Sequence, residues 1–295
     1  PGGGCGDGLT RFFDLSCWKV IMFDQRGSLR SLPFGELKDN TPQLSIADME
    51  SIRHHLKIEQ WVLFGGSWGS TLAILYGQEH PESCLGFILR GVFLAREQDY
   101  RYIVDGIGKI FPEAHQELVG FIPEEERGDL LEAYYKRVLD PDPSVHQPAA
   151  NVFMKYDFVC STFEPDPEGV RSLLAHQGLS LNMARTFLHY AHHRFFLTPN
   201  QILDRMGRIS HLPALIVQGR WDAICPSEMA YLLYQNWDNS MLWIVTRGGH
   251  SSGERPYTSS LVLATDLFAD KLIKADNLPL STQKNLWQRL FKIGN

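Results

Sequence analysis

The stretch Trp61-Val-Leu-Phe-Gly-Gly-Ser-Trp-Gly-Ser-Thr-Leu-Ala-Ile-Leu75 decides the fold class of this chain. Its first four residues form an apolar run typical of a buried strand, and residues 70–78 favour a helix. Between them, Gly65-x-Ser67-x-Gly69 matches the sharp strand-to-helix turn that exposes a nucleophilic serine. The apolar strand before this turn and the helix after it make the match much more specific than the bare pattern.

The same rhythm continues on both sides of the turn. Further strands are expected at 18–23, 84–89, 214–218 and 241–245, and further helices at 45–56, 227–234 and 259–274. Strands that alternate with helices predict a mostly parallel α/β sheet. From 93 to 208 the pattern is helical, with prolines that read as turns. We therefore expect an α/β core at 1–92 and 209–295, interrupted by an inserted helical cap at 93–208.

Composition and charge exclude several classes of protein. The chain has 28 Lys and Arg against 34 Asp and Glu, a net charge of −6, which argues against nucleic-acid and membrane-surface partners. No apolar run reaches the roughly 18–20 residues of a membrane helix. Five scattered cysteines favour a reducing, cytoplasmic compartment. His189 and His193 lack the acidic neighbour of a zinc motif, so we interpret them as part of a partly buried helix face and not as metal ligands.

Two later segments supply the partners that a nucleophilic serine needs. Asp222 follows the strand that ends at 218, and His250 follows the next strand on a glycine-flanked loop. Both positions lie beyond the carboxyl ends of strands, where α/β sheets gather catalytic groups. We expect Ser67 to attack a carbonyl carbon, His250 to accept its proton and Asp222 to hold the imidazole. The backbone N–H of Trp68 is expected to stabilise the oxyanion.

Four segments of the chain carry a family resemblance. They are Pro1-Gly-Gly-Gly4, Phe23-Asp-Gln-Arg-Gly27, Phe64-Gly-Gly-Ser-Trp-Gly-Ser-Thr-Leu-Ala73, and Val217-Gln-Gly-Arg-Trp-Asp-Ala-Ile-Cys-Pro226 with Gly248-Gly-His-Ser251. In these segments the chain resembles the proline iminopeptidases, serine aminopeptidases that remove an N-terminal proline. The resemblance is weakest in the cap. It implies an α/β-hydrolase fold whose helical cap selects short peptides by their free amino end. It also implies a reaction that needs neither a metal nor a cofactor.

The resemblance also suggests residues of a substrate pocket. Gly2 and Gly3 correspond to part of the family's H-G-G-P-G-G-G loop. The segment Phe153-Met-Lys-Tyr-Asp157 corresponds to W-x-x-W-E and keeps rings and an acid. The segment Ala184-Arg-Thr-Phe-Leu-His-Tyr-Ala191 corresponds to A-R-x-E-N-H-Y-F. The implied substrate contacts are Gly2, Gly3, Phe153, Tyr156, Asp157, Phe187 and Tyr190.

Three departures from the family pattern leave alternatives open. The second oxyanion donor and the strand leading to it are expected to lie before Pro1, which leaves N-terminal strands missing and a gap between 18–23 and 61–64. Phe187 stands where the family has the glutamate that holds the substrate's ammonium. Leu29 replaces a residue that is usually small.

The principal expectation is a serine aminopeptidase that releases N-terminal proline from short peptides through an acyl-enzyme. A proline amine on a compact ring suits an aromatic pocket that contains an acid. One alternative is an esterase or broader amidase, in which Phe187 makes the pocket neutral and the substrate is a small ester or amide. The other is a catalytically dead, truncated homologue that serves as a binding module.

Overall fold

The computed structural model describes residues 1–276, so the part of the second core segment at 277–295 lies outside the described residues. Within 1–276, a four-stranded sheet has the order β1-β2-β3-β4, and every neighbouring pair is parallel. The strands are β1 (Trp61–Ser67), β2 (Cys84–Val92), β3 (Ala214–Gly219) and β4 (Ser240–Val245). The predicted parallel α/β class is therefore confirmed.

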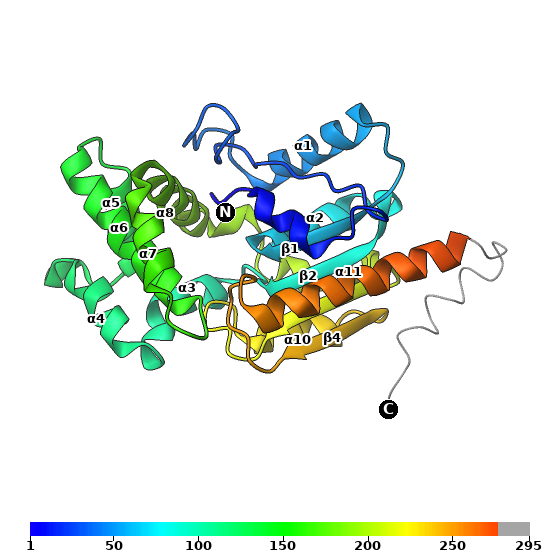
Figure 1. Cartoon of the computed structure of the whole chain (residues 1–295). Helices are drawn as coiled ribbons and strands as arrows, with labels where there is room; N and C mark the ends of the chain where they lie inside the picture. Colours follow the sequence, from blue (N-terminus) through cyan, green and yellow to red (C-terminus); the bar gives the residue numbers. More distant parts are fainter. Residues whose placement is uncertain (277–295) are drawn as a thin grey trace.

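Helices cover both faces of this sheet (Figure 1). They are α1 (Pro42–His55), α2 (Trp68–Glu79), α10 (Ser227–Gln235), α11 (Arg255–Asp276) and the short 3-10 helix η1 (Asp7–Phe12). Successive strand residues point to opposite faces. Phe87 and Leu89 of β2 belong to the buried cluster that includes α2 and α10. Ile88, between them, joins the cluster beneath η1 and α11.

Between β2 and β3 the chain is helical. The α-helices are α3 (Glu97–Asp105), α4 (Pro112–Gly120), α5 (Leu130–Val138), α6 (Pro143–Cys160), α7 (Pro167–Ala175), α8 (Gln177–His192) and α9 (Gln201–Asp204). Short 3-10 helices in this region are η3 (Ile107–Lys109), η4 (Glu124–Glu126), η5 (Arg194–Phe196) and η6 (Met206–Arg208), whereas η2 (Pro81–Ser83) lies just before β2. Helices α5 to α8 form a group beside the sheet (Figure 1), and the buried apolar cluster continues from the sheet into them.

Proline marks where several of these helices begin. Pro112, Pro143 and Pro167 stand in the first turns of α4, α6 and α7. Proline suits this position because its missing N–H would have no partner there anyway. The carboxylates of Asp142 and Asp166 cap α6 and α7 by accepting backbone N–H groups. Three of the prolines that read as turns therefore begin helices. None of the helices in the described part of the chain is both long and apolar enough to span a bilayer.

The strand predicted at 18–23 was wrong. This stretch has no regular secondary structure, and β1 is an edge strand among the described residues. Its apolar side chains are nevertheless used, because Trp18 packs edge-on against Phe13, which in turn packs against Phe64 of β1. An apolar run indicates burial, and burial does not require a ladder of hydrogen bonds. The other expected helices and strands are confirmed, with bounds that shift by a few residues.

The interface between α2 and β2 gives a stability prediction. A Cβ at Gly77 would overlap the ring of Phe87, reaching its Cε1 at 2.8 Å. That ring is fully buried and packs against Trp237, with ring centroids 5.0 Å apart, so it cannot swing away freely. Overpacking costs about 1–3 kcal/mol, which exceeds the roughly 0.5–1 kcal/mol that alanine gains over glycine in a helix.

We therefore expect Gly77→Ala to lower the free energy of unfolding by about 1–2 kcal/mol, measured by urea denaturation. Gly120→Ala is the matched control, because a Cβ at this helical glycine meets nothing within 4 Å. An unchanged or higher urea midpoint for Gly77→Ala would show that the β2 face accommodates the extra methyl group.

Candidate active site

Ser67 lies at the turn from β1 to α2 in a strained backbone conformation. Its φ of 55° and ψ of −127° are rare for a residue with a side chain. A Cβ at Gly65 would overlap the carbonyl oxygen of Gly69, so the chain passes itself too closely for any other residue at 65. A Cβ at Gly69 meets nothing within 4 Å. The turn therefore requires the first glycine of the motif for space, and it does not require the second.

Asp222 and His250 form a hydrogen-bonded pair. Nδ1 of His250 lies 2.9 Å from Oδ2 and 3.0 Å from Oδ1 of Asp222. The side chain of Asp222 is 0% exposed. Its Oδ1 accepts the backbone N–H groups of Ile224 at 3.1 Å and Cys225 at 2.8 Å, and its Oδ2 accepts Nε2 of Gln218 at 3.0 Å. Four hydrogen-bond partners therefore satisfy this buried carboxyl group.

Two residues that the sequence analysis did not identify as functional contact this pair from the ends of β2 and β3. Gln218, at the end of β3, donates to Asp222 and accepts the backbone N–H of Val92 at 2.9 Å through Oε1. Gly91, at the end of β2, has a φ of 49°, and a Cβ there would lie 3.1 Å from Cε1 of His250. The available signal was weak: a glutamine and a glycine, each at the carboxyl end of a strand.

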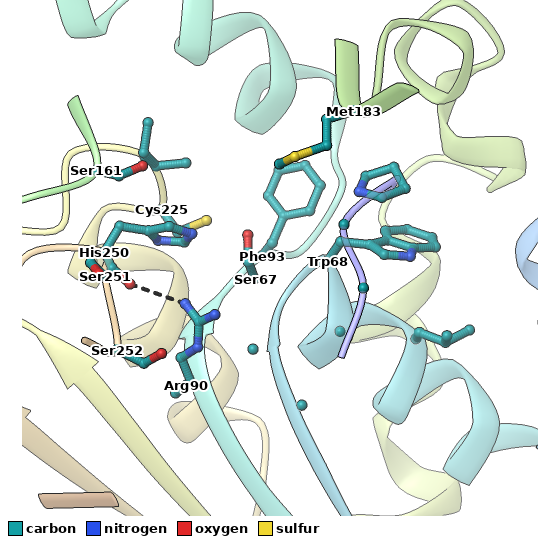
Figure 2. A pocket seen from close by; sticks show the side chains of 18 of the residues that line it. Ser67, Trp68, Arg90, Phe93, Ser161, Met183, Cys225, His250, Ser251 and Ser252 are labelled. Atoms are coloured by element: carbon teal, nitrogen blue, oxygen red, sulfur yellow. Dashed lines mark hydrogen bonds between the residues drawn. The ribbon is translucent and has the colours of Figure 1, made fainter. Parts of the chain in front are cut away.

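The backbone of His250 is held as firmly as its ring. Its N–H donates to the carbonyl oxygen of Ser161 at 2.8 Å, and the N–H of Ser251 donates to the same oxygen at 2.9 Å. Nη1 of Arg90 donates to the carbonyl oxygen of His250 at 3.0 Å, the dashed line in Figure 2. The histidine loop is therefore fixed from the sheet through Arg90 and from the helical insertion through Ser161.

A cavity of about 560 Å³ opens over the turn. Ser67 and His250 line it, and in Figure 2 the hydroxyl of Ser67 points into the space between the imidazole and the ring of Phe93. Apolar side chains supply most of the remaining wall, among them Phe93, Ile103, Phe153, Met183, Phe187 and Ile224. The cavity is large enough for a small ligand and presents a hydroxyl and an imidazole to it.

Four of the expected substrate contacts line this cavity, namely Gly3, Phe153, Asp157 and Phe187. Among the described residues, Asp157 is the only carboxylate in the lining. Burial raises the pKa of its carboxyl above the usual value, and His250 acts in the opposite direction. Phe187 packs against Phe153 with ring centroids 5.8 Å apart. The lining thus combines aromatic rings with a single acid.

The other three expected contacts lie outside the cavity. The hydroxyl of Tyr156 donates to the carbonyl oxygen of Ile103 at 3.0 Å, and that of Tyr190 donates to Asn40 at 3.0 Å. Both rings are buried in the core. Gly2 packs against α8 instead, where a Cβ would clash with its backbone. Their expected contact with a substrate is therefore corrected to a structural role, because each side chain or backbone faces the protein interior.

Trp68 is the first residue of α2, so its backbone N–H belongs to the free amino end of that helix. Its indole is fixed by a 2.8 Å hydrogen bond to Gln25 and by edge-on packing against Tyr190. A helix amino end favours a nearby negative charge. Cys225 also lines the cavity, but burial raises the pKa of its thiol well above the usual value. It is therefore a poor nucleophile compared with an accessible thiolate.

Comparison with solved structures confirms the fold. The chain is similar to MGS-M2, an alpha/beta hydrolase enzyme from a Medee basin deep-sea metagenome library, at 17% identity with a TM-score of 0.55 over 88% of this chain and 83% of that one. It is also similar to an alpha/beta fold family hydrolase from Bacillus anthracis, at 17% identity and a TM-score of 0.50 over 84% and 78%. The alpha/beta hydrolase fold family matches residues 7–254.

Sequence comparison narrows the family. The chain is 41% identical to the "Probable proline iminopeptidase" of Leptolyngbya boryana over 91% of this chain and 84% of that protein. It is 38% identical to the proline iminopeptidase of Arabidopsis thaliana over 90% and 70%, and 37% identical to that of Xylella fastidiosa (strain Temecula1) over 91% and 86%. Together with the fold, these similarities show that the chain belongs to the proline iminopeptidase family of α/β-hydrolases.

Proposed function

We propose that this chain is a serine aminopeptidase that releases N-terminal proline from short peptides. The observation that carries the proposal is that His250, hydrogen-bonded to the buried Asp222, lines the same cavity as the strained Ser67. In this reading Ser67 is the nucleophile, His250 the general base and Asp222 the residue that orients the imidazole. Residues 93–208 act as the cap over the site.

The reaction follows from these positions. Ser67 Oγ forms a bond to the substrate's carbonyl carbon while its proton passes to His250. The charge that develops on the carbonyl oxygen lies near the backbone N–H of Trp68, at the amino end of α2. The peptide C–N bond then breaks, and His250 returns the proton to the leaving amine. Water, activated by the same imidazole, hydrolyses the acyl-enzyme and releases proline.

The cavity wall suits the amino end of such a substrate. Asp157 supplies one negative charge for the protonated secondary amine of an N-terminal proline. The rings of Phe153 and Phe187 offer apolar surface to the five-membered ring. Because a half-buried carboxylate without a partner has lost part of its hydration, a bound ammonium compensates the charge of Asp157. This arrangement selects substrates with a free amino end.

Phe187 favours a second candidate function, that of an esterase or amidase for uncharged acyl groups. Its ring lines the cavity where the family pattern has a glutamate, so the cavity has one acid fewer. Comparison of a prolyl arylamide, its N-acylated analogue and a short acyl ester separates the two functions. Faster turnover of the blocked amide and the ester than of the free amine would favour the esterase.

Replacement of the nucleophile tests the triad. We expect Ser67→Ala to lower kcat for a prolyl arylamide by at least about 10⁴-fold, because no hydroxyl remains to form the acyl-enzyme. The loss is measured by release of the arylamine under saturating substrate. Ser51→Ala is the control, since Ser51 is an exposed serine on α1 that bonds only to its own helix.

Labelling by a fluorophosphonate probe accompanies this measurement. Wild-type protein and Ser51→Ala are expected to react with the probe, and Ser67→Ala is not. A folded wild-type protein that neither reacts with the probe nor hydrolyses the arylamide would support the catalytically dead homologue instead. Equal turnover by wild-type protein and Ser67→Ala would reject Ser67 as the nucleophile.

Asp157 gives a prediction about specificity. Asp157→Asn should lower kcat/KM for the free-amine arylamide by about 10- to 100-fold, the value of one charge-assisted hydrogen bond. The N-acylated analogue carries no cation, so its kcat/KM should change by less than about 3-fold. Asp105→Asn, an exposed acid of α3 outside the cavity, is the control.

The same substrate pair gives a pH dependence. Asp157 accepts the ammonium only as a carboxylate, so the ratio of kcat/KM for the free amine over the blocked amide should fall as pH decreases. Because burial raises the pKa of Asp157, the fall begins above the usual range of an aspartate, about 3.9. The ratio cancels any pH dependence that the two substrates share. A ratio that varies equally in wild type and Asp157→Asn would exclude Asp157 as the ammonium partner.

A further inference from the structure

Glu254 connects the histidine loop to the segment that follows α6. Its Oε2 accepts the backbone N–H of Gly249 at 2.6 Å, directly before His250. Its Oε1 accepts the backbone N–H of Phe163 at 2.5 Å, in the segment after α6. Both hydrogen bonds are short, as is typical when the acceptor is a carboxylate. One carboxylate therefore joins two segments that are distant in the sequence.

The two segments lie in close contact at this point. A Cβ at Gly249 would lie 2.7 Å from the backbone nitrogen of Phe163 and 3.0 Å from the carbonyl oxygen of Ser161. That same carbonyl oxygen accepts the N–H groups of His250 and Ser251. Four backbone N–H groups are thus satisfied by one carboxylate and one carbonyl. We call this set of contacts, made by Glu254 and Ser161, the loop clamp.

The loop clamp is directly connected to α6, the helix that carries Asp157. Ser161 is the C-terminal cap residue of α6, and its hydroxyl donates to the carbonyl oxygen of Asp157 at 2.8 Å. Asp157 lies one turn earlier, where it lines the cavity. Figure 2 shows Ser161 directly beside the imidazole of His250. The end of α6 therefore holds the histidine loop, and the turn before it faces the ligand.

We propose that Glu254 is a positioning residue that couples the end of α6 to the catalytic histidine. It does not line the cavity and acts only through the backbone of Gly249 and Phe163. When all contacts of the loop clamp are present, the ring of His250 stays aligned between Asp222 and Ser67. Without it, the loop relaxes away from α6 and the imidazole loses its alignment. This inference rests on the proposed function of the triad.

A neighbouring ion pair provides a matched control. Glu164 and Arg247 join the same two segments, with Oε1 and Nη2 3.3 Å apart. Their side chains are 76% and 73% exposed, so water competes for the contact. Exposed pairs of this kind contribute little to the free energy of folding. Glu164→Gln therefore makes the same chemical change, between the same segments, outside the clamp.

The test compares Glu254→Gln with Glu164→Gln in the whole chain. The glutamine amide keeps one acceptor but turns an NH₂ group toward the second backbone N–H, which breaks one arm of the clamp. We expect Glu254→Gln to lower kcat for the prolyl arylamide by about 10- to 100-fold, as misplacement of a catalytic group does. KM should change by less than about 3-fold, since the substrate contacts remain. Glu164→Gln should stay within about 2-fold of wild type in kcat.

Two further measurements separate positioning from mere stability. Rates are expressed per active site, counted by complete labelling with a fluorophosphonate, so that unfolded protein does not lower kcat. The rate of labelling itself should fall in Glu254→Gln, because it depends on the same imidazole and not on any peptide. If Glu254→Gln does not fold, Gly249→Ala replaces it, since its methyl group pushes Phe163 away while Glu254 remains.

The proposal is overturned if Glu254→Gln has the same kcat and labelling rate per active site as Glu164→Gln. It is also overturned if Glu254→Gln only raises KM. The proposed function is judged separately, on wild-type protein. If wild type is labelled by the probe but does not release proline, the peptidase function fails while the labelling rates still decide the role of Glu254.

Discussion

A buried negative charge is the constraint on which the rest of the site depends. The side chain of Asp222 is closed to water, so every lone pair must meet a donor from the protein. Two backbone N–H groups of its own loop, the amide of Gln218 and the imidazole of His250 meet this demand. The imidazole is thereby fixed with Nδ1 toward the acid and Nε2 toward the cavity, which is the orientation that a base for Ser67 requires.

Both the sheet and the helical insertion contribute residues to the site around this carboxylate. From the sheet come the strained turn at Ser67 and the glycine at 91, which leaves room for the imidazole. From the insertion come the aromatic wall and the acid at Asp157. Helix α6 connects the two parts, because the residue at its end bonds to the histidine loop that follows β4. One apolar cluster runs through sheet and insertion, so these contacts rest on a common core.

Local patterns predicted most of the architecture. The run from 61 to 75 encodes strand, turn and helix within one short segment, so its structure depends little on distant parts of the chain. The stretch 18–23 is equally apolar but forms no strand, because a strand also needs a partner and only the assembled sheet supplies one. Tyr156 and Tyr190 matched a family pattern, yet their rings are buried in the core because helix rotation decides which face meets the cavity.

By itself, the sequence determined the parallel α/β class, the nucleophile turn and the candidates Asp222 and His250, since each stands at a strand end with a recognisable spacing. Only the tertiary structure decided that the acid and the imidazole touch. It also decided that Gln218 and Glu254 hold them in place. The reason is physical: these two residues act by bonding to side chains and backbone groups that folding brings close, and such contacts leave no periodic trace along the chain.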